Sequence, residues 1–210
     1  MAEDGKRVGG VRAGIVLLGA VWSVVLPTFG AAQAEGGPAI ELCCAWGRSL
    51  ADGQLTYSLS GADPATGDVM RGAIRAWDDA LPTIVLREVP EGTKKTDIVI
   101  IYTEGSGDSE GLAVTSFTQR GLIKQAKLNV DAPRAPGGTG AVEQITKHEM
   151  GHALGLRHAN FEGDLMSPIV NPVPGPMSGC DVAGVIEANR WQTTDGRRSP
   201  RPPTATSVPC

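Results

Sequence analysis

The sequence predicts an α/β protein of the α+β kind, with a twisted five-stranded sheet and three helices. Three observations support this fold class. Five short segments are apolar at alternate residues or throughout, as β-strands are. Two longer segments have apolar residues three or four apart, as in helices that pack on a core. A third helix is indicated by residues 148–158, HEMGHALGLRH, in which the first two histidines lie four residues apart.

Residues 1–34 have the features of a secretory signal peptide. Lys6, Arg7 and Arg12 precede an apolar run at residues 13–26, and Ala32-Gln33-Ala34 matches a small-residue cleavage site. We expect cleavage after Ala34, a secreted and extracellular protein, and no membrane association once the signal is removed. An uncleaved apolar segment that anchors the chain in a membrane is the alternative.

A folded domain is expected over residues 54–191, after an N-terminal arm at residues 35–53 that has no strong period. In the first strand Leu55, Tyr57 and Leu59 alternate on one face. The third strand is a run of branched apolar residues and should lie in the centre of the sheet. The five expected strands cover residues 54–59, 84–88, 97–102, 112–118 and 126–130.

The first helix is expected at residues 68–80. Val69, Ala73 and Trp77 repeat every four residues on one face, and Pro82 lies just beyond the last turn. The spacing indicates a helix that packs on the core.

Two more helices follow the strands. The histidine helix should begin near Ala141, with Thr139 able to cap it. Residues 178–181 form a capping box for a last helix that ends near Trp191. Residues 192–210 contain prolines and no period, and are expected to be a disordered tail.

The four cysteines suit an oxidising location and allow three disulfide connectivities. Because Cys43 and Cys44 are adjacent, a bond between them would be strained, so links from this pair to Cys180 and Cys210 are favoured. An alternative role for one N-terminal thiolate is to bind a metal and keep the protein latent.

All three histidines of the chain lie in residues 148–158, which indicates a shared metal ion. On a helix His148 and His152 share a face, and Gly155 permits a reversal that brings His158 to the same ion. Three imidazoles leave the fourth position of a tetrahedral zinc site open, as catalytic sites do. Glu149 could reach a metal-bound water without binding the metal.

The extended motif HEMGHALGLRH, followed by the turn Asp164-Leu165-Met166-Ser167-Pro168, resembles the metzincin zinc metalloproteases, and most closely their matrixin branch. The resemblance implies a mixed sheet, a catalytic zinc bound by His148, His152 and His158, and Glu149 as general base. It also implies that Met166 forms a hydrophobic base under the metal.

The same resemblance assigns the substrate cleft. Leu112 and Ala113 match the edge strand of the family, and Pro168 with Ile169 would wall the pocket for the substrate side chain that follows the cleaved bond. Two features differ from the family. Ser167 stands where matrixins have a tyrosine, and the chain has no histidines left for their second, structural zinc.

A glycine-rich acidic loop at residues 103–111 could bind calcium through Glu104, Asp108 and Glu110. A solvated loop is the favoured alternative, because loops of this composition commonly lie at the surface.

The net charge of −4, without a basic block, argues against nucleic acid as a partner. We expect a monomeric, secreted zinc endopeptidase that acts on polypeptides. Two other classes stay open: a zinc-binding adhesion or interaction module without catalysis, and a zinc hydrolase that acts on non-peptide amides or esters.

Overall fold

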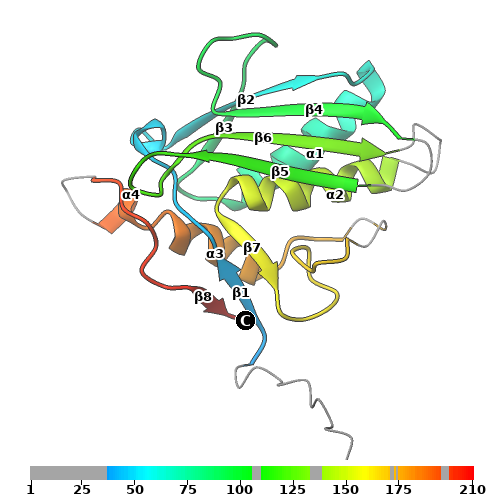
Figure 1. The fold of residues 1–210 in the computed structure, drawn as a ribbon. Coiled ribbons are helices and arrows are strands. Elements are labelled where there is room, and N and C mark those ends of the chain that lie inside the picture. Colours follow the sequence, from blue (N-terminus) through cyan, green and yellow to red (C-terminus); the bar gives the residue numbers. More distant parts are fainter. Residues whose placement is uncertain (1–36, 106–109, 133–138, 171–172, 174, 195–198) are drawn as a thin grey trace, which may run out of the picture. The chain divides into compact units, whose positions relative to one another are not determined.

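A computed structural model describes residues 37–105, 110–132, 139–170, 173, 175–194 and 199–210, and it confirms the predicted fold class (Figure 1). The main sheet has five strands in the order β3-β2-β4-β6-β5. Neighbours from β3 to β6 are parallel, and β5 is antiparallel to β6, so the sheet is mixed. The bounds are β2 Gln54–Ser60, β3 Val85–Glu88, β4 Ile98–Glu104, β5 Glu110–Phe117 and β6 Ile123–Ala132.

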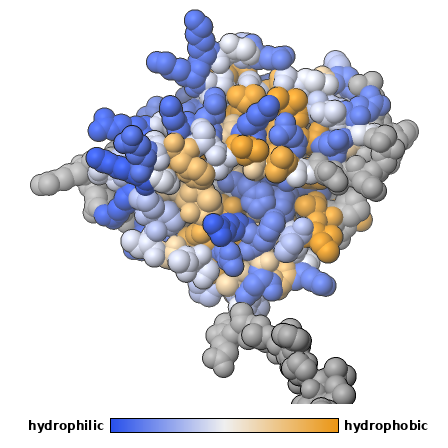
Figure 2. Space-filling model, in the orientation of Figure 1, coloured by the Kyte–Doolittle hydropathy of each residue, from blue (hydrophilic) through white to orange (hydrophobic). Residues whose placement is uncertain are grey.

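Strand β5 is at the edge of the sheet, and among the described residues β6 is its only strand partner. Its outer edge therefore presents backbone N–H and C=O groups that another extended chain could pair with. Leu112 and Val114 on this strand are more than half exposed. Figure 2 shows hydrophobic side chains gathered over the region of β5 and β6.

Helix α1, Pro64–Ala80, begins four residues earlier than the periodicity predicts. Asp63 is its N-cap and accepts a hydrogen bond from the Thr66 backbone N–H at 3.0 Å. Pro64 fits the first turn, where its missing N–H costs nothing. The helix therefore starts at Pro64 rather than at residue 68.

Helix α2, Thr139–Ala153, contacts α1, β5 and β6 and lies against one face of the sheet (Figure 1). Val142, Ile145 and Ala153 of this helix are buried in the core. The Trp77 indole N–H of α1 donates to the Lys147 carbonyl at 2.9 Å, immediately before the first histidine. This bond ties α2 to the neighbouring helix α1.

A second, three-stranded sheet has the order β7-β1-β8. Its strands are β1 Ala39–Leu42, β7 Leu156–Ala159 and β8 Ser207–Pro209, and helix α3, Gly179–Ala188, contacts all three of them. The short helices η1, Arg48–Leu50, and α4, Trp191–Thr194, complete the described elements. The predicted last helix is thus two helices, and the segment expected to be a disordered tail includes α4 and β8.

The structure contradicts the predicted disulfide links between the adjacent pair and the distant cysteines. Cys43 is bonded to Cys44, and Cys180 to Cys210. β8 pairs with β1 and carries Cys210 to the start of α3, where the Cα atoms of Cys180 and Cys210 are 5.4 Å apart. Spacing along the chain did not reveal this approach, because it depends on a strand pairing between the two ends of the domain.

The predicted signal peptide at residues 1–34 lies outside the described residues. Within the described part of the chain, the helices are too short or too polar to span a bilayer.

Candidate metal centre

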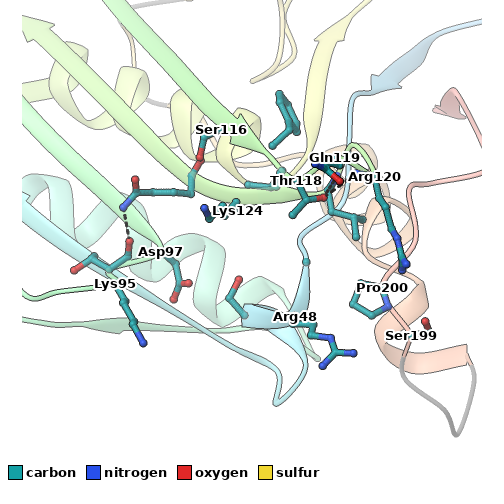
Figure 3. A pocket seen from close by; sticks show the side chains of 17 residues that line it. Arg48, Lys95, Asp97, Ser116, Thr118, Gln119, Arg120, Lys124, Ser199 and Pro200 are labelled. Carbon is teal, nitrogen blue, oxygen red and sulfur yellow. Dashed lines mark hydrogen bonds between the residues drawn. The ribbon is translucent and has the colours of Figure 1, made fainter.

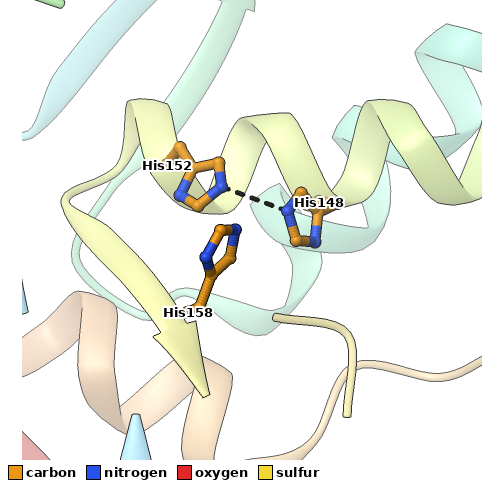
Figure 4. A group of neighbouring side chains, drawn as sticks. All are labelled: His148, His152 and His158. Atoms are coloured by element: carbon orange, nitrogen blue, oxygen red, sulfur yellow. Dashed lines mark hydrogen bonds between the residues drawn. The ribbon is translucent and has the colours of Figure 1, made fainter. Parts of the chain in front are cut away.

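The three histidines converge on one point (Figure 4). His148 and His152 project from the same face of α2, and His158 comes from β7. The ring centroids are 4.7, 5.4 and 4.9 Å apart, and one nitrogen from each ring lies within 4.8 Å of the others. Among the described residues this is the only group of three or more His, Cys, Asp or Glu side chains arranged to hold a metal.

Gly155 makes the convergence possible. Its φ of +110° reverses the chain after α2, and a Cβ here would collide with the Cys44 carbonyl. The Cys43 backbone N–H donates to the Gly155 carbonyl at 2.9 Å, so the N-terminal segment packs directly on the reversal. Only glycine meets both requirements.

Backbone carbonyls orient two of the rings. The Nδ1 of His148 lies 2.7 Å from the Leu165 carbonyl, and the Nδ1 of His152 lies 3.0 Å from the Leu156 carbonyl. Each Nδ1 must therefore carry a proton and donate it, which leaves both Nε2 atoms as acceptors.

Those two Nε2 atoms are 3.1 Å apart. Two lone pairs at this distance repel each other unless a cation lies between them. In a tetrahedral zinc site with Zn–N bonds of 2.0–2.1 Å, neighbouring nitrogens are about 3.3 Å apart. The donor set and its spacing thus fit zinc.

Burial keeps the rings in the neutral form that binds metals. It lowers the pKa of His148 to about 4; the nearby His152 and His158 act in the same direction, and the hydrogen bond to Leu165 opposes them. Burial also lowers the pKa of His152. Proton competition for these two rings is therefore weak at neutral pH.

Glu149 is 3% exposed and lies beside the histidines at the base of the cleft. Burial raises the pKa of its carboxyl group to about 7, against the effect of a hydrogen bond from the Ala113 backbone. Oε2 has no hydrogen-bond partner among the described atoms. A buried carboxylate oxygen without a partner is available to a water molecule in the cleft.

Met166 is fully buried and packs against α2 at Gly151, the residue before His152. A Cβ on Gly151 of α2 would collide with its sulfur atom, so the glycine lets the helix rest on the methionine. The Met166 N–H donates to Asp164 Oδ1 at 2.9 Å, and the Met166 carbonyl accepts from the Ala159 N–H at 2.7 Å. The turn is therefore tied to the end of β7.

A cleft of about 580 Å³ contains the site. The structure brings together eight of the residues selected from the sequence: Leu112, Ala113, His148, Glu149, His152, His158, Pro168 and Ile169 all line this cleft. Strand β5 forms one wall and residues 168–170 form another.

Three residues at the site were not selected from the sequence: Gly111 packs on Glu149, Gly151 packs on Met166, and Arg157 lines the cleft. Cys43, one of the two candidates for a latency thiolate, also lines the cleft, but it is bonded to Cys44. For Arg157 a signal existed, since it adjoins a candidate ligand. For the glycines no local signal existed, because their role is to leave space for side chains distant in the sequence.

The calcium hypothesis stays a prediction. Asp108 and the side chain of Glu110 lie outside what the structure describes.

Comparison with known proteins gives one family. A model of the family described as matrixin matches residues 45–187. The chain is similar to human matrix metalloproteinase-15, 28% identical over 191 residues that cover 78% of this chain and 28% of that protein. It is similar to human matrix metalloproteinase-16, 32% identical over 136 residues, 54% of this chain and 22% of that protein. It is also similar to the hatching enzyme of Paracentrotus lividus, 34% identical over 146 residues, 63% of this chain and 24% of that protein. The chain spans about a quarter of the length of these relatives.

Proposed function

Because the chain belongs to the matrixin family, we propose that it is a zinc-dependent endopeptidase with His148, His152 and His158 as zinc ligands and Glu149 as general base. The observation that supports this most directly is the convergence of three imidazoles beside a buried carboxylate, in a cleft bordered by a free strand edge.

A bound zinc ion would act as a Lewis acid that polarises a carbonyl group and lowers the pKa of a coordinated water to about 7. The protein supplies the proton transfer. Glu149 takes a proton from the attacking water with the oxygen that has no protein partner, and passes it to the leaving amine. A hydrogen bond from the Ala113 backbone to the Glu149 carboxyl group ties this side chain to β5.

Substrate binding follows from the walls of the cleft. An extended peptide pairs with the outer edge of β5 beside Leu112 and Ala113 through main-chain hydrogen bonds. Pro168 and Ile169 form the opposite wall, and Ile169 is 85% exposed, which leaves it free to contact an apolar substrate side chain. Met166 supports the metal ligands from below and contacts no substrate.

The proposal includes export. Removal of residues 1–34 releases a monomeric, extracellular protein whose peptidase domain covers residues 54–191. The substrates are polypeptides, and calcium bound by the acidic loop at residues 103–111 is a further, separate proposal.

The test is digestion of an unstructured protein by the purified chain, with and without a zinc chelator, beside Glu149→Gln. We expect cleavage to fall by about 10²–10⁴-fold in the variant, because general base catalysis contributes that factor, while one zinc per chain is retained. Glu91→Gln, an exposed acid in a turn, is the matched control and should cut normally.

Other outcomes separate the two remaining classes. A chain that holds one zinc but cuts nothing supports a binding module. Turnover of small acyl substrates with every polypeptide left intact supports a hydrolase of non-peptide amides or esters.

A further inference from the structure

A second recess, of about 840 Å³, lies beyond the end of the metal cleft, between the β5–β6 turn, η1 and the turn before β4 (Figure 3). Ser199 and Pro200 of the C-terminal segment border it as well. None of the metal-centre residues lines it, so it is a separate site.

Four cations surround this recess: Arg48, Lys95, Arg120 and Lys124. We call the recess that these four side chains surround the basic recess. All four side chains are exposed, and within the described part of the chain none of them forms an ion pair with an acid. The concentration of positive charge stands out, because the chain as a whole carries a net charge of −4.

Among the described residues, Asp97 is the one acidic residue that lines the recess, and its carboxylate is hydrogen-bonded to Thr56. Asp97 Oδ2 accepts hydrogen bonds from the Thr56 backbone N–H at 2.8 Å and from the Thr56 hydroxyl at 2.6 Å. Asp97 thus joins β2 to the start of β4 and neutralises only part of the surrounding charge. The remaining lining is rich in hydroxyl and amide groups, which include Ser116, Thr118 and Gln125.

Lys95 has a φ of +66° and is the only non-glycine residue with positive φ in the described regions. A long side chain in this conformation costs free energy that the surrounding structure must offset, and such residues concentrate at functional sites. Here the strained backbone presents a cation at the rim of the recess. The positive φ of Lys95 is a second observation, independent of the number of cations around the recess.

Strand β5 connects the recess to the metal cleft. Gly111 to Ala113 and Thr115 line the cleft, whereas Ser116 and Phe117 line the recess. The four steps from Ala113 to Phe117 span about 13 Å at about 3.3 Å per residue. A peptide paired with the outer edge of β5 would therefore run from the metal centre to the end of this strand, where Ser116 and Phe117 border the basic recess.

We propose that the basic recess binds an acidic segment of the substrate, roughly four to seven residues from the scissile bond on the side that lies towards the carboxyl end of β5. This inference rests on the proposed function, whose substrate class it specifies. Two further points favour a peptide over a nucleic acid or a sulfated polysaccharide. The recess adjoins the end of β5, whose outer edge can pair with a peptide backbone, and the acidic remainder of the protein repels long polyanions.

The first experiment measures binding without cleavage. Two labelled peptides share an apolar centre, and each carries a block of four acidic residues, one at its N-terminal end and the other at its C-terminal end. Both are titrated against Glu149→Gln. In the control peptides Asn and Gln replace the acidic residues of the block. We expect the acidic block at one of the two ends to tighten binding about tenfold at low salt, with the gain reduced at high salt.

Charge reversal then locates the effect. Arg120→Glu with Lys124→Glu, both exposed, should abolish the gain. Arg75→Glu with Arg87→Glu changes the net charge equally at exposed cations away from the recess, and should keep the gain. Equal binding of acidic and neutral peptides overturns the inference. Equal loss in both double variants also overturns it, as does charge-dependent binding of a heparin fragment without any preference for acidic peptides.

Cleavage by the unmodified chain separates this inference from the proposed function. The acidic block should lower KM by about tenfold and leave kcat unchanged, because the recess acts away from the reacting bond. If every peptide is cut at the same kcat/KM, the inference fails and the endopeptidase stands. If no peptide is cut but the charge-dependent binding is present, the endopeptidase fails and the recess remains a site for acidic peptides.

Discussion

Gly111 brings the backbone of β5 against the carboxyl group of Glu149. A Cβ at this position would collide with Glu149 Oε1 and lie 2.7 Å from the Cγ2 atom of Ile145. Both atoms belong to α2, so the missing side chain sets how closely the edge strand approaches the helix. The distance between a peptide on β5 and the proposed general base depends on this approach.

Gly111→Ala should therefore lower kcat/KM by about 10–100-fold, because a displacement of about 1 Å at a reacting group costs a factor of that order. Zinc content should stay at one per chain, since the three candidate ligands are unchanged. Gly179→Ala, where a Cβ meets nothing within 4 Å, is the control. Cleavage at the normal rate by Gly111→Ala would show that Glu149 adapts to the extra atom.

The contrast between His148 and Gly111 explains what could be predicted at the residue scale. The histidines act through their own nitrogen atoms, and their spacing on one helix is visible in eleven consecutive residues. Gly111 acts through an absent atom, and its neighbours are more than thirty residues away in the chain. Such a constraint appears only when the strand and the helix are placed together.

Helix α1 has a weak point at Gly72. A Cβ added there would meet nothing within 4 Å, yet glycine in a helix interior costs backbone entropy. Gly72→Ala should raise the free energy of unfolding by about 0.5–1 kcal/mol in urea denaturation.

Gly67 on the same helix gives the comparison for Gly72. Its Cβ would lie 3.2 Å from Arg71 Nη1, and Glu88 holds that guanidinium group through a 2.9 Å bond to Nε. Gly67→Ala should therefore stabilise less than Gly72→Ala. An equal gain at both positions would contradict this account of the crowding.

Long elements with a regular pattern were predictable, and short ones with distant partners were not. The strands of the main sheet carry period-two or continuous apolar patterns over several residues. β1 and β8 have four and three residues, and Ile40 pairs with Val208 across almost the whole domain. Their register depends on the folded chain and leaves no local pattern.

The start of α3 predicts a pH effect. Asp181 closes the capping box with Ser178 and is buried. Burial raises its pKa to about 7, the nearby Asp164 adds to the rise, and hydrogen bonds from Ser178 oppose it. Since the pKa in the folded state is above the ordinary value near 3.9, the protonated form is favoured by folding, and its stabilisation is lost as the pH rises through about 7.

The melting temperature of the chelator-treated protein should therefore fall between pH 5 and pH 8. Glu149, whose pKa burial also raises to about 7, contributes in the same direction. Asp181→Asn cannot ionise, so its melting temperature should fall less over this range. A variant with the same pH slope as the parent would exclude Asp181 as a source of the effect.

At the scale of the whole molecule, the second sheet joins the two ends of the domain to the metal centre. β1 lies between β8 and β7, and β7 carries His158. The bond between Cys180 and Cys210 holds β8 to α3, which in turn contacts β1 and β7. The C-terminal segment thus supports the strand that supplies the third candidate ligand.

The two disulfides should differ in their effect on stability. The bond between Cys180 and Cys210 closes a loop with a sequence separation of 30, so Cys180→Ser with Cys210→Ser should lower the free energy of unfolding by about 2–4 kcal/mol. The bond between Cys43 and Cys44 closes no loop of that kind, since the residues are adjacent. Replacement of both by alanine should cost less, because it frees little conformational entropy in the unfolded chain.

Chemical denaturation of the zinc-loaded and chelator-treated forms checks both double variants. In the zinc-loaded form, the loss in the Cys180 and Cys210 variant should be accompanied by weaker zinc retention, because β8 no longer restrains β1 beside β7. The Cys43 and Cys44 variant should keep its zinc, since the Gly155 carbonyl is bonded to the backbone N–H at position 43, which the substitution preserves. Equal losses of stability in the two variants would contradict the assignment of the effect to loop closure.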